Sequence, residues 1–366
     1  MLLSRFYKTF PVPAYLELST AGIDISDASI KYVGLRHSPE GYWLDKHGEF
    51  LLPPGTVVDG KIVDQQKLIE GLAKIQKKTG WKYVHTALPE EETFVVRLNI
   101  PQEKPEFLRD SIELLLEEQI PVPASEVIFD FEVYDTPHEG REEYLLAVYA
   151  VPKSVVEGYT GALKAAGFIP ASLEVEVQSG VRALIPAGDQ GTYMITDLGR
   201  TRTSFAIVSR GKVMFTSTVK SVGGEALTRA VERGTGVSFA EAEKMKIKNG
   251  LLNSPQNKKV FEALLPMCAI LKDETVRHFN FWEGLCQSGQ VCEPITKLIF
   301  CGGQATLPGL VKYISADLPA KAETGNAWSS LPGAPGQVPP LSFSDSLRYD
   351  VAIGLALRGA TNLKLN

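Results

Sequence analysis

The chain has 366 residues, with 38 Lys and Arg against 43 Asp and Glu, and a formal net charge of -5. Hydrophobic residues make up 44% and charged residues 22%, which is ordinary globular composition and excludes an intrinsically disordered chain. The mildly acidic balance gives no general attraction to nucleic acid, and no apolar run approaches the ~18 residues of a membrane helix. The length predicts two to three domains of ~100–200 residues each.

Strand-like and helix-like patterns alternate along the chain, which predicts an α/β fold. The apolar run at residues 144–151 predicts a buried strand, and clusters of Gly and Pro mark the breaks between elements. Apolar periodicity and capping residues predict helices over 64–78, from Pro105, from Pro152 to Gly167, from Ser238 to Gly250, and over 261–285.

The four cysteines are Cys268, Cys286, Cys292 and Cys301, and no two have the C-x-x-C spacing of a zinc site. We therefore expect reduced, buried thiols and no metal ligation by cysteine. The five histidines show neither an H-E-x-x-H motif nor the arrangement of a Ser-His-Asp triad, so the sequence gives no sign of either kind of hydrolase.

A weak internal repeat is the most informative feature of the sequence. Residues 22–35 and 194–208 each contain an apolar strand that ends in an aspartate, Asp24 or Asp197, followed by a turn of small and polar residues and a second strand. A further strand follows in each half. Two such lobes facing each other would form a clamp that offers one aspartate and one turn from either side.

This pattern suits a polyphosphate ligand. A tight turn exposes successive backbone N–H groups, which form a concavity that binds anions. An aspartate at the strand end cannot face phosphate directly, but it can hold Mg²⁺ through water, because Mg²⁺ keeps several of its waters. The repeat therefore predicts one phosphate chain with Mg²⁺ between the two turns.

A third signal lies at residues 297–310, which read as a strand, a Gly302-Gly303 turn and a helix opened by Pro308. Glycines at such a turn allow a flat base or a phosphate to lie against the backbone. A Gly-Gly turn is common by itself, and its position after two aspartate hairpins is what makes it informative.

In their order and spacing these motifs resemble the actin/Hsp70/FtsA superfamily of nucleotide-binding proteins and, within it, the PilM family of type IV pilus assembly. The resemblance covers roughly residues 20–360. The matching segments are the first phosphate loop at 22–31, L-P-P-G-T-V-V-D-G-K-I-V-D at 52–64, A-L-P at 87–89, E-E-Q-I-P-V-P at 117–123, F-D-F-E-V at 129–133, V-E-V-Q-S-G-V-R-A-L at 175–184, the second phosphate loop at 197–203, S-V-G-G-E-A-L at 221–227, A-E-K-M-K at 242–246 and a final helix at 349–358.

The resemblance implies an actin-like (ribonuclease H-like) α/β fold, duplicated into two domains, with an inserted subdomain of the FtsA/PilM type. The expected boundaries are an N-terminal extension over 1–20, domain I over 21–85, the inserted subdomain over 86–170, an interdomain helix of domain I over 171–190, domain II over 191–345, and a C-terminal helix over 346–366 that returns to domain I.

The resemblance also implies a site for ATP and Mg²⁺. Asp24 and Asp197 would organise the Mg²⁺ ion and the lytic water, and Gln178 or Glu176 would position that water. The residues that would contact the nucleotide are Ser26, Ser29 and Lys31 in the first loop, Gly199, Thr201 and Thr203 in the second, the E-x-x-K pair Glu243 and Lys246 at the ribose, and Gly302 and Gly303 at the adenosine. The alternatives are a solvated Lys31 and a plain surface ion pair of Glu243 with Lys246.

The first loop departs from the family pattern, in which D-x-G is followed by a hydroxyl residue. Ser26 stands at the glycine position, which would cost about 1 kcal/mol if that position requires a positive φ. Asp27 stands where Ser or Thr would donate to phosphate, and a carboxylate only accepts hydrogen bonds and repels phosphate. Either Asp27 turns outward and ATP is hydrolysed slowly or not at all, or the fold is a scaffold without nucleotide.

The implied function is a cytoplasmic actin-like scaffold of the inner-membrane platform that assembles the pilus, and at most a slow ATPase. A groove beside the inserted subdomain would receive the cytoplasmic N-terminal tail of a PilN-like membrane protein, with Phe107, Leu114 and Leu115 as candidate lining residues. Contact with the membrane would be indirect, through this partner. No nucleic-acid partner is expected, and self-association is left open.

Four alternatives remain at this point: a nucleotide-free pseudo-ATPase of the same fold, an FtsA-like filament former, a sugar kinase, and the related scaffold of type II secretion. An FtsA-like protein would carry a C-terminal amphipathic membrane helix, for which residues 360–366 are too short. A sugar kinase would need a catalytic aspartate in a substrate cleft and larger insertions. The secretion scaffold would continue into a membrane span.

Overall fold

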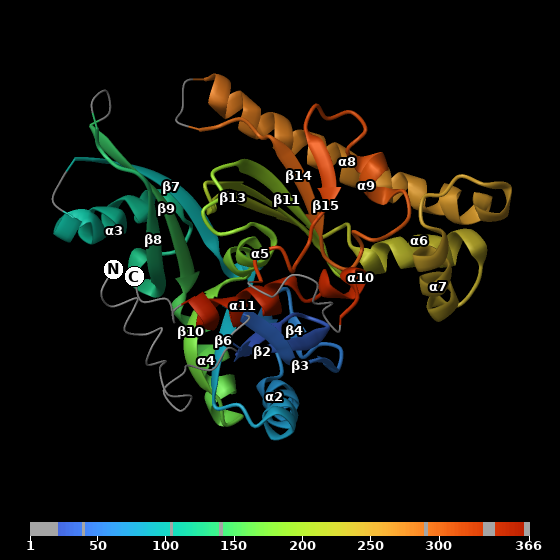
Figure 1. The fold of residues 1–366 in the computed structure, drawn as a ribbon, viewed down its shortest axis with the longest axis horizontal. Coiled ribbons are helices and arrows are strands. Elements are labelled where there is room, and N and C mark those ends of the chain that lie inside the picture. Colours follow the sequence, from blue (N-terminus) through green and yellow to red (C-terminus); the bar gives the residue numbers. More distant parts are fainter. Residues whose placement is uncertain are drawn as a thin grey trace.

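The computed structural model describes residues 21–38, 41–102, 105–138, 142–288, 292–331 and 341–361. The expected N-terminal extension and the last five residues lie outside these ranges. Figure 1 shows two lobes, each built around a five-stranded sheet, and a smaller unit with a three-stranded sheet of its own.

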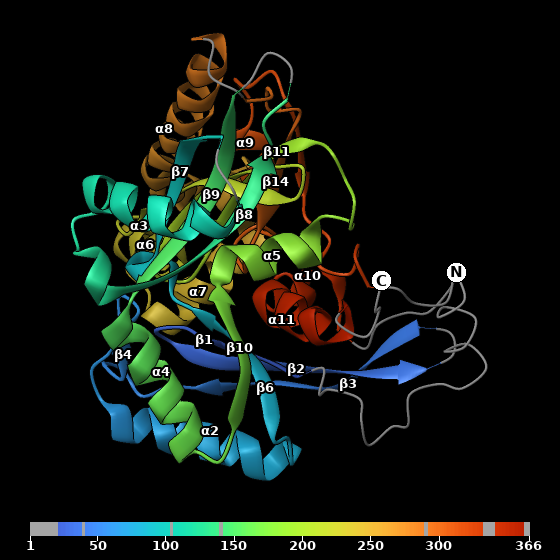
Figure 2. The same ribbon diagram turned by 90° about the vertical axis from the view of Figure 1, so that its left-hand side faces the viewer.

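The first lobe centres on a mixed sheet with the strand order β10-β6-β1-β2-β3. Its strands are β1 (Ala21–Ile25), β2 (Ser29–Ser38), β3 (Gly41–Leu51), β6 (Tyr83–Leu88) and β10 (Ile169–Val175). Alternate residues of β2 pack into two different hydrophobic cores, because successive side chains of a strand point to opposite faces of the sheet. Ile30 and Tyr32 pack with α2 (Gln65–Thr79) and α4 (Lys153–Ala165). Val33 and Leu35 pack with α11 (Asp350–Thr361) on the other face. Figure 2 shows α11 on one side of this sheet and α2 on the other.

Helix α2 illustrates how local sequence sets an element. The Asp64 side chain accepts a hydrogen bond from the amide of Lys67 and caps the N-terminus. Gly80 ends the helix with a φ of 71°, a left-handed conformation that glycine adopts without strain. The expected helix over 64–78 is confirmed.

The second lobe repeats the topology of the first, with the strand order β13-β12-β11-β14-β15. Its strands are β11 (Thr192–Leu198), β12 (Thr203–Ser209), β13 (Lys212–Val219), β14 (Lys297–Cys301) and β15 (Lys321–Thr324). In both sheets the central strand runs antiparallel to the strand that follows it and parallel to a strand that comes much later. The predicted duplication is therefore confirmed.

The helices of the second lobe are α6 (Gly224–Thr235), α7 (Phe239–Asn249), α8 (Lys258–Gln287), α9 (Leu310–Ile314) and α10 (Phe343–Ser346). The Ser238 hydroxyl caps α7 by accepting from the amide of Glu241, as the capping-box pattern predicts. Helix α8 runs through Pro266 and spans 30 residues, longer than expected at both ends.

Helices α5 (Glu176–Leu184) and α11 pack tightly against each other between the lobes. A Cβ atom on Gly354 of α11 would lie 1.8 Å from the carbonyl oxygen of Ser179 in α5. A Cβ on Gly22 of β1 would lie 2.2 Å from the carbonyl oxygen of Ala352. These glycines allow α11 to lie directly against both α5 and the first sheet.

The smaller unit, which we call the insert, contains β7 (Phe94–Pro101), β8 (Val127–Asp135), β9 (Glu143–Pro152) and α3 (Leu108–Gln119). One face of its sheet packs on α3, and the other face joins the core of the second lobe through Leu145, Ala147 and Tyr149. The insert is narrower than the expected 86–170, because α4 packs in the first lobe's core. Two short 3-10 turns, η3 (Pro105–Phe107) and η4 (Ala124–Glu126), flank α3.

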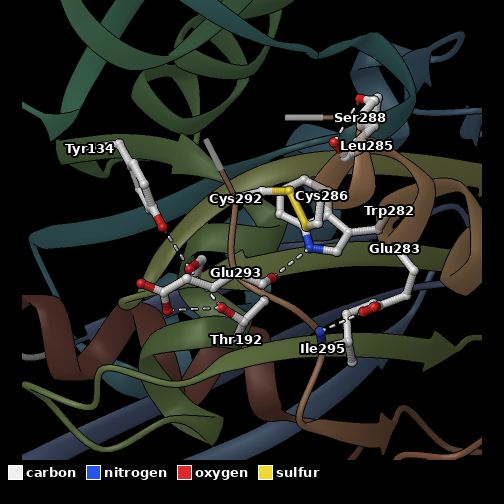
Figure 3. Close-up of a disulfide and its surroundings, with 11 residues drawn as sticks. Tyr134, Thr192, Trp282, Glu283, Leu285, Cys286, Ser288, Cys292, Glu293 and Ile295 are labelled. Atoms are coloured by element: carbon white, nitrogen blue, oxygen red, sulfur yellow. Dashed lines mark hydrogen bonds between the residues drawn. A yellow bond between two sulfur atoms is a disulfide. The ribbon is translucent and has the colours of Figure 1, made fainter. Parts of the chain in front are cut away.

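The cysteine prediction was wrong for one pair. Cys286, in the last turn of α8, is bonded to Cys292, which precedes β14 (Figure 3). Beside this disulfide, the Trp282 indole donates to the carbonyl of Glu293 at 2.9 Å. Cys268 and Cys301 are buried free thiols, as predicted. The pairing was not legible in the sequence because it depends on α8 ending close to the segment that leads back into the sheet.

Across the portion of the chain that the structure describes, no helix combines the length and the apolar character needed to cross a membrane.

Candidate functional site

The two aspartates of the internal repeat occupy equivalent positions in the two sheets. Asp24 is the second-last residue of β1 and pairs with Lys31 of β2. Asp197 is the second-last residue of β11 and pairs with Ser204 of β12. In each lobe the partner residue comes seven positions later, and both aspartates line one cleft of about 400 Å³ between the lobes.

Most of the expected site residues line this cleft. They are Asp24, Ser26, Ser29, Lys31, Asp197, Gly199, Thr201, Glu243, Lys246, Gly302 and Gly303. Two are placed elsewhere. The Thr203 hydroxyl is buried and donates to the carbonyl of Val222 at 2.7 Å. The Gln178 side chain lies at the start of α5 and accepts from the amide of Val175. Glu176, which was named beside Gln178 in the sequence analysis, lines the cleft in its place.

The structure accounts for both departures in the first loop. Ser26 is not among the residues with a positive φ, so its side chain causes no backbone strain. Its hydroxyl donates to the carbonyl of Ser29 at 3.0 Å and closes the turn. The Asp27 carboxylate accepts hydrogen bonds from the amides of Asp59 and Gly60, both at 3.1 Å. These two residues form the turn between β4 (Val57–Val58) and β5 (Lys61–Ile62).

The side-chain amine of Lys31 lies in the floor of the cleft, 3.4 Å from the carboxylate of Asp24. Burial alone would lower the pKa of Lys31, but the negative charges of Asp24, Glu49 and Asp350 outweigh it and raise that pKa. Lys31 is therefore cationic at neutral pH and supplies a positive charge to an otherwise acidic floor.

Arg202 is a cleft residue that the sequence analysis did not single out. It follows Thr201 in the second loop, and its guanidinium lies 2.6 Å from Glu91 and 2.7 Å from Glu176. The signal was present in the sequence as an arginine inside a predicted phosphate loop. Its partners could not be identified there, because they come from the entrance to the insert and from the N-terminus of α5.

Buried carboxyl groups surround this arginine. Burial raises the pKa of Glu176 well above its ordinary value, and it also raises the pKa of Asp197, in both cases against the attraction of Arg202. Burial and the charge of Asp197 raise the pKa of Asp350, at the start of α11, to about 7. Burial raises the pKa of Glu90 to about 8. Burial therefore favours the protonated, neutral form of these carboxyl groups, and the attraction of Arg202 opposes this effect at Glu176, Asp197 and Glu90.

Glu243 and Lys246, the pair expected at the ribose, have different roles in the structure. The Lys246 side chain is buried, donates to the carbonyl of Gly224 and the hydroxyl of Thr228, and pairs with Glu243 at 2.8 Å. The Glu243 side chain is partly exposed at the cleft. In this arrangement Glu243 can meet a ligand hydroxyl, while Lys246 holds the carboxylate and α6 in place.

The Gly302-Gly303 turn lies directly behind the second aspartate. Gly302 has a φ of 78°, and a Cβ there would lie 2.1 Å from the carboxylate of Asp197. Beside it, Gln304 has a buried side-chain oxygen for which the described residues supply no hydrogen-bond partner. The turn thus places backbone and an amide oxygen along the cleft wall, where a flat, polar ring could lie.

The donor set fits Mg²⁺ together with a polyphosphate. Asp24 and Asp197 line the cleft from opposite lobes, and Mg²⁺ is usually held by one or two carboxylates with water and substrate phosphates. Within the described ranges no group of three or more His, Cys, Asp or Glu could hold a metal ion by itself. A cation here would therefore share its coordination with ligand oxygens and water.

Comparison with known proteins gives the family and the fold of the chain. A sequence profile described as type IV pilus assembly protein PilM matches residues 22–360. The chain is similar to a solved PilM-PilN type IV pilus biogenesis complex, with a TM-score of 0.76 and 23% identity over 94% of this chain and 99% of that one. It is also similar to MreB5 of Spiroplasma citri bound to ADP, with a TM-score of 0.56 and 13% identity over 94% and 97% of the two chains.

A further similar structure is the ethanolamine utilization protein EutJ from Carboxydothermus hydrogenoformans, with a TM-score of 0.53 and 17% identity over 95% of this chain and 91% of that one. At these identities the structural likeness shows a shared actin-like fold. The sequence profile, in contrast, extends through both lobes and the insert, and the chain therefore belongs to the PilM family of type IV pilus assembly proteins.

Proposed function

We propose that the cleft binds ATP with Mg²⁺ and that the protein acts as a nucleotide-binding scaffold in type IV pilus assembly. The observation that carries the proposal is the placement of Asp24 and Asp197, which occupy equivalent positions in two equivalent sheets and line one cleft. Bound Mg²⁺ would supply the positive charge that lets a triphosphate approach these carboxylates. Glu243, Gly302 and Gly303 would then meet the nucleoside.

Hydrolysis in this proposal is slow or absent. Glu176 is the cleft carboxylate to which we assign the orientation of water. One of its oxygens lies 2.7 Å from the Arg202 guanidinium. An oxygen that already accepts from the guanidinium at this distance is less available to accept a hydrogen bond from the lytic water. We expect turnover below about 1 s⁻¹, the low end of ordinary enzymes.

Calorimetric titration with Mg-ATP tests the proposal. Wild-type protein should bind, and Asp24→Asn and Asp197→Asn should each weaken Mg-dependent binding by at least about tenfold, since each removes a charge that holds the cation. The control is Glu157→Gln on the exposed face of α4, which should bind like the wild type. Absence of binding by the wild type would favour the nucleotide-free scaffold.

The second part of the proposal is a partner, the cytoplasmic N-terminal tail of a PilN-like membrane protein, which would hold this protein at the cytoplasmic side of the inner membrane. Strand β8 is an edge strand of the insert and can pair with an extended peptide. Phe107, Leu114 and Ile128 are exposed apolar residues of the insert, at 49%, 73% and 47%. Leu115 packs partly into the core of the insert, so it is a weaker candidate for contact.

A binding assay with a synthetic PilN-type N-terminal peptide tests the partner. Phe107→Ala should weaken binding about tenfold, the cost of a typical aromatic anchor. Phe281 on α8 offers a matched control. It is an aromatic residue of nearly the same exposure, 48%, and it lies in the second lobe instead of the insert. Equal loss on Phe281→Ala would point to a different surface.

A further inference from the structure

The chain enters the insert through a short segment that contacts the second phosphate loop directly and the first one through the β4–β5 turn. This segment, which we call the insert root, comprises residues 89–92 and includes the 3-10 turn η2 (Glu90–Glu92) between β6 and β7. It is one of two chain connections between the insert and the first lobe, the other being the passage from β9 into α4.

The first phosphate loop reaches the insert root through the β4–β5 turn. The Asp27 carboxylate holds the amide of Gly60. A Cβ atom on Gly60 would lie 2.6 Å from the side chain of Pro89, so this turn and the insert root are in direct contact. Lys61, the next residue, pairs with Glu92 at 3.5 Å.

The second phosphate loop reaches the insert root through Arg202. Its guanidinium pairs with Glu91 of the insert root and with Glu176 of α5, and the exposed fractions of the three side chains are 14%, 2% and 11%. The other carboxylate oxygen of Glu91 is buried and has no hydrogen-bond partner among the described residues. Because charge in a desolvated site must be compensated, the position of Glu91 depends strongly on Arg202.

An anionic ligand in the cleft would compete for the same guanidinium. Arg202 directly follows Gly199, Arg200 and Thr201 in the loop that faces the ligand. Arginine binds phosphate oxygens with the same fork of N–H donors that it offers to carboxylates. When phosphate accepts hydrogen bonds from Arg202, fewer N–H donors remain for Glu91 and Glu176. Of these two carboxylates, Glu91 is the one that belongs to the insert root.

We propose that Arg202 is a positioning residue that links the cleft to the insert: an anion at the phosphate loops draws the guanidinium away from Glu91 and loosens the insert root. The inference rests on the proposed nucleotide site and adds its regulation. Coupling between two sites is reciprocal. If nucleotide in the cleft changes the affinity of the insert root for a partner by some factor, that partner changes the affinity of the cleft for nucleotide by the same factor.

A double-mutant cycle read by calorimetry with Mg-ATP tests this linkage. Glu91→Gln removes the competing charge and should tighten binding about tenfold, within the usual range of coupling between sites. Arg202→Gln should weaken binding, and the double variant should show no gain from Glu91→Gln. The control is Glu157→Gln on the exposed face of α4, which lies outside the insert root and should bind like the wild type.

Hydrogen exchange gives a second readout that a merely structural role would not change. Mg-ATP should speed exchange of the amides of residues 90–96 in the wild type and leave them unchanged in Arg202→Gln. If the wild type binds nucleotide and Glu91→Gln binds no more tightly, the linkage is refuted while the nucleotide site stands. If neither the wild type nor Glu91→Gln binds, both proposals fall. Binding by Glu91→Gln alone would support the linkage.

Discussion

The Asp27 carboxylate accepts a hydrogen bond from the amide of Gly60, 33 positions later in the chain and 3.1 Å away. It accepts a second one from the amide of Asp59. The residue that breaks the family pattern of the first phosphate loop thus has a structural role: it holds the β4–β5 turn against the loop. Asp59 in turn pairs with Lys220 of the second lobe at 3.1 Å, so the turn links the two lobes.

Asp27→Ser, which restores the hydroxyl of the family pattern, should destabilise the protein. The shorter side chain cannot reach both amides, and the loss of charge-assisted hydrogen bonds should cost about 1–2 kcal/mol in the free energy of unfolding. Urea denaturation measures this change. Glu113→Gln, on the exposed face of α3, is the control and should stay within about 0.5 kcal/mol of the wild type. An unchanged unfolding midpoint for Asp27→Ser would refute the structural role.

Glu90 should make stability depend on pH. Burial raises the pKa of its carboxyl group to about 8, from an ordinary value of 4.5, so the folded protein holds a proton that the unfolded chain releases. The stability contributed by this group is complete below the ordinary pKa and is lost as the pH rises toward 8, by up to about 1.4 kcal/mol per pH unit.

The variant Glu90→Gln isolates that contribution, because glutamine mimics the protonated acid. Unfolding midpoints between pH 5 and pH 8.5 should fall less steeply for Glu90→Gln than for the wild type. The exposed Glu117→Gln is the control and should keep the wild-type slope. Identical slopes for all three proteins would show that Glu90 is ionised in the folded state.

Gly354→Ala should disrupt the contact between α11 and α5. The added methyl group would lie 1.8 Å from the carbonyl oxygen of Ser179, and relief requires one helix to move. We expect a loss of about 3 kcal/mol or more in the free energy of unfolding. In Gly284→Ala on α8 the methyl group meets no atom within 4 Å, and that variant should gain up to about 1 kcal/mol from helix propensity. Calorimetric unfolding temperatures compare the two.

The disulfide can be tested by counting the free thiols of the protein. Thiol titration of the denatured, unreduced protein should find two thiols, Cys268 and Cys301, and reduction should raise the count to four. Removing the bond with Cys286→Ser should lower the free energy of unfolding by about 2 kcal/mol, the effect of opening a short loop. Four thiols before reduction would show that Cys286 and Cys292 are not paired in the purified protein.

Local sequence determined much of the fold. Asp64 and Gly80 set the ends of α2, Ser238 opens α7, and the run at 144–151 gave a buried strand, because caps and apolar periodicity act within a few residues of chain. The two aspartates were also found from sequence, since a duplicated strand–turn–strand pattern can be recognised without knowing how the lobes are placed.

Tertiary structure alone decided what those elements bring to the cleft. Arg202 meets Glu91 and Glu176, Asp27 turns to Gly60, and Thr203 faces the core instead of the cleft. Each of these outcomes depends on segments that are tens to more than a hundred positions apart in the chain. The direction of a side chain at a turn is set by the neighbours that pack against it, and short-range sequence patterns carry no information about those neighbours.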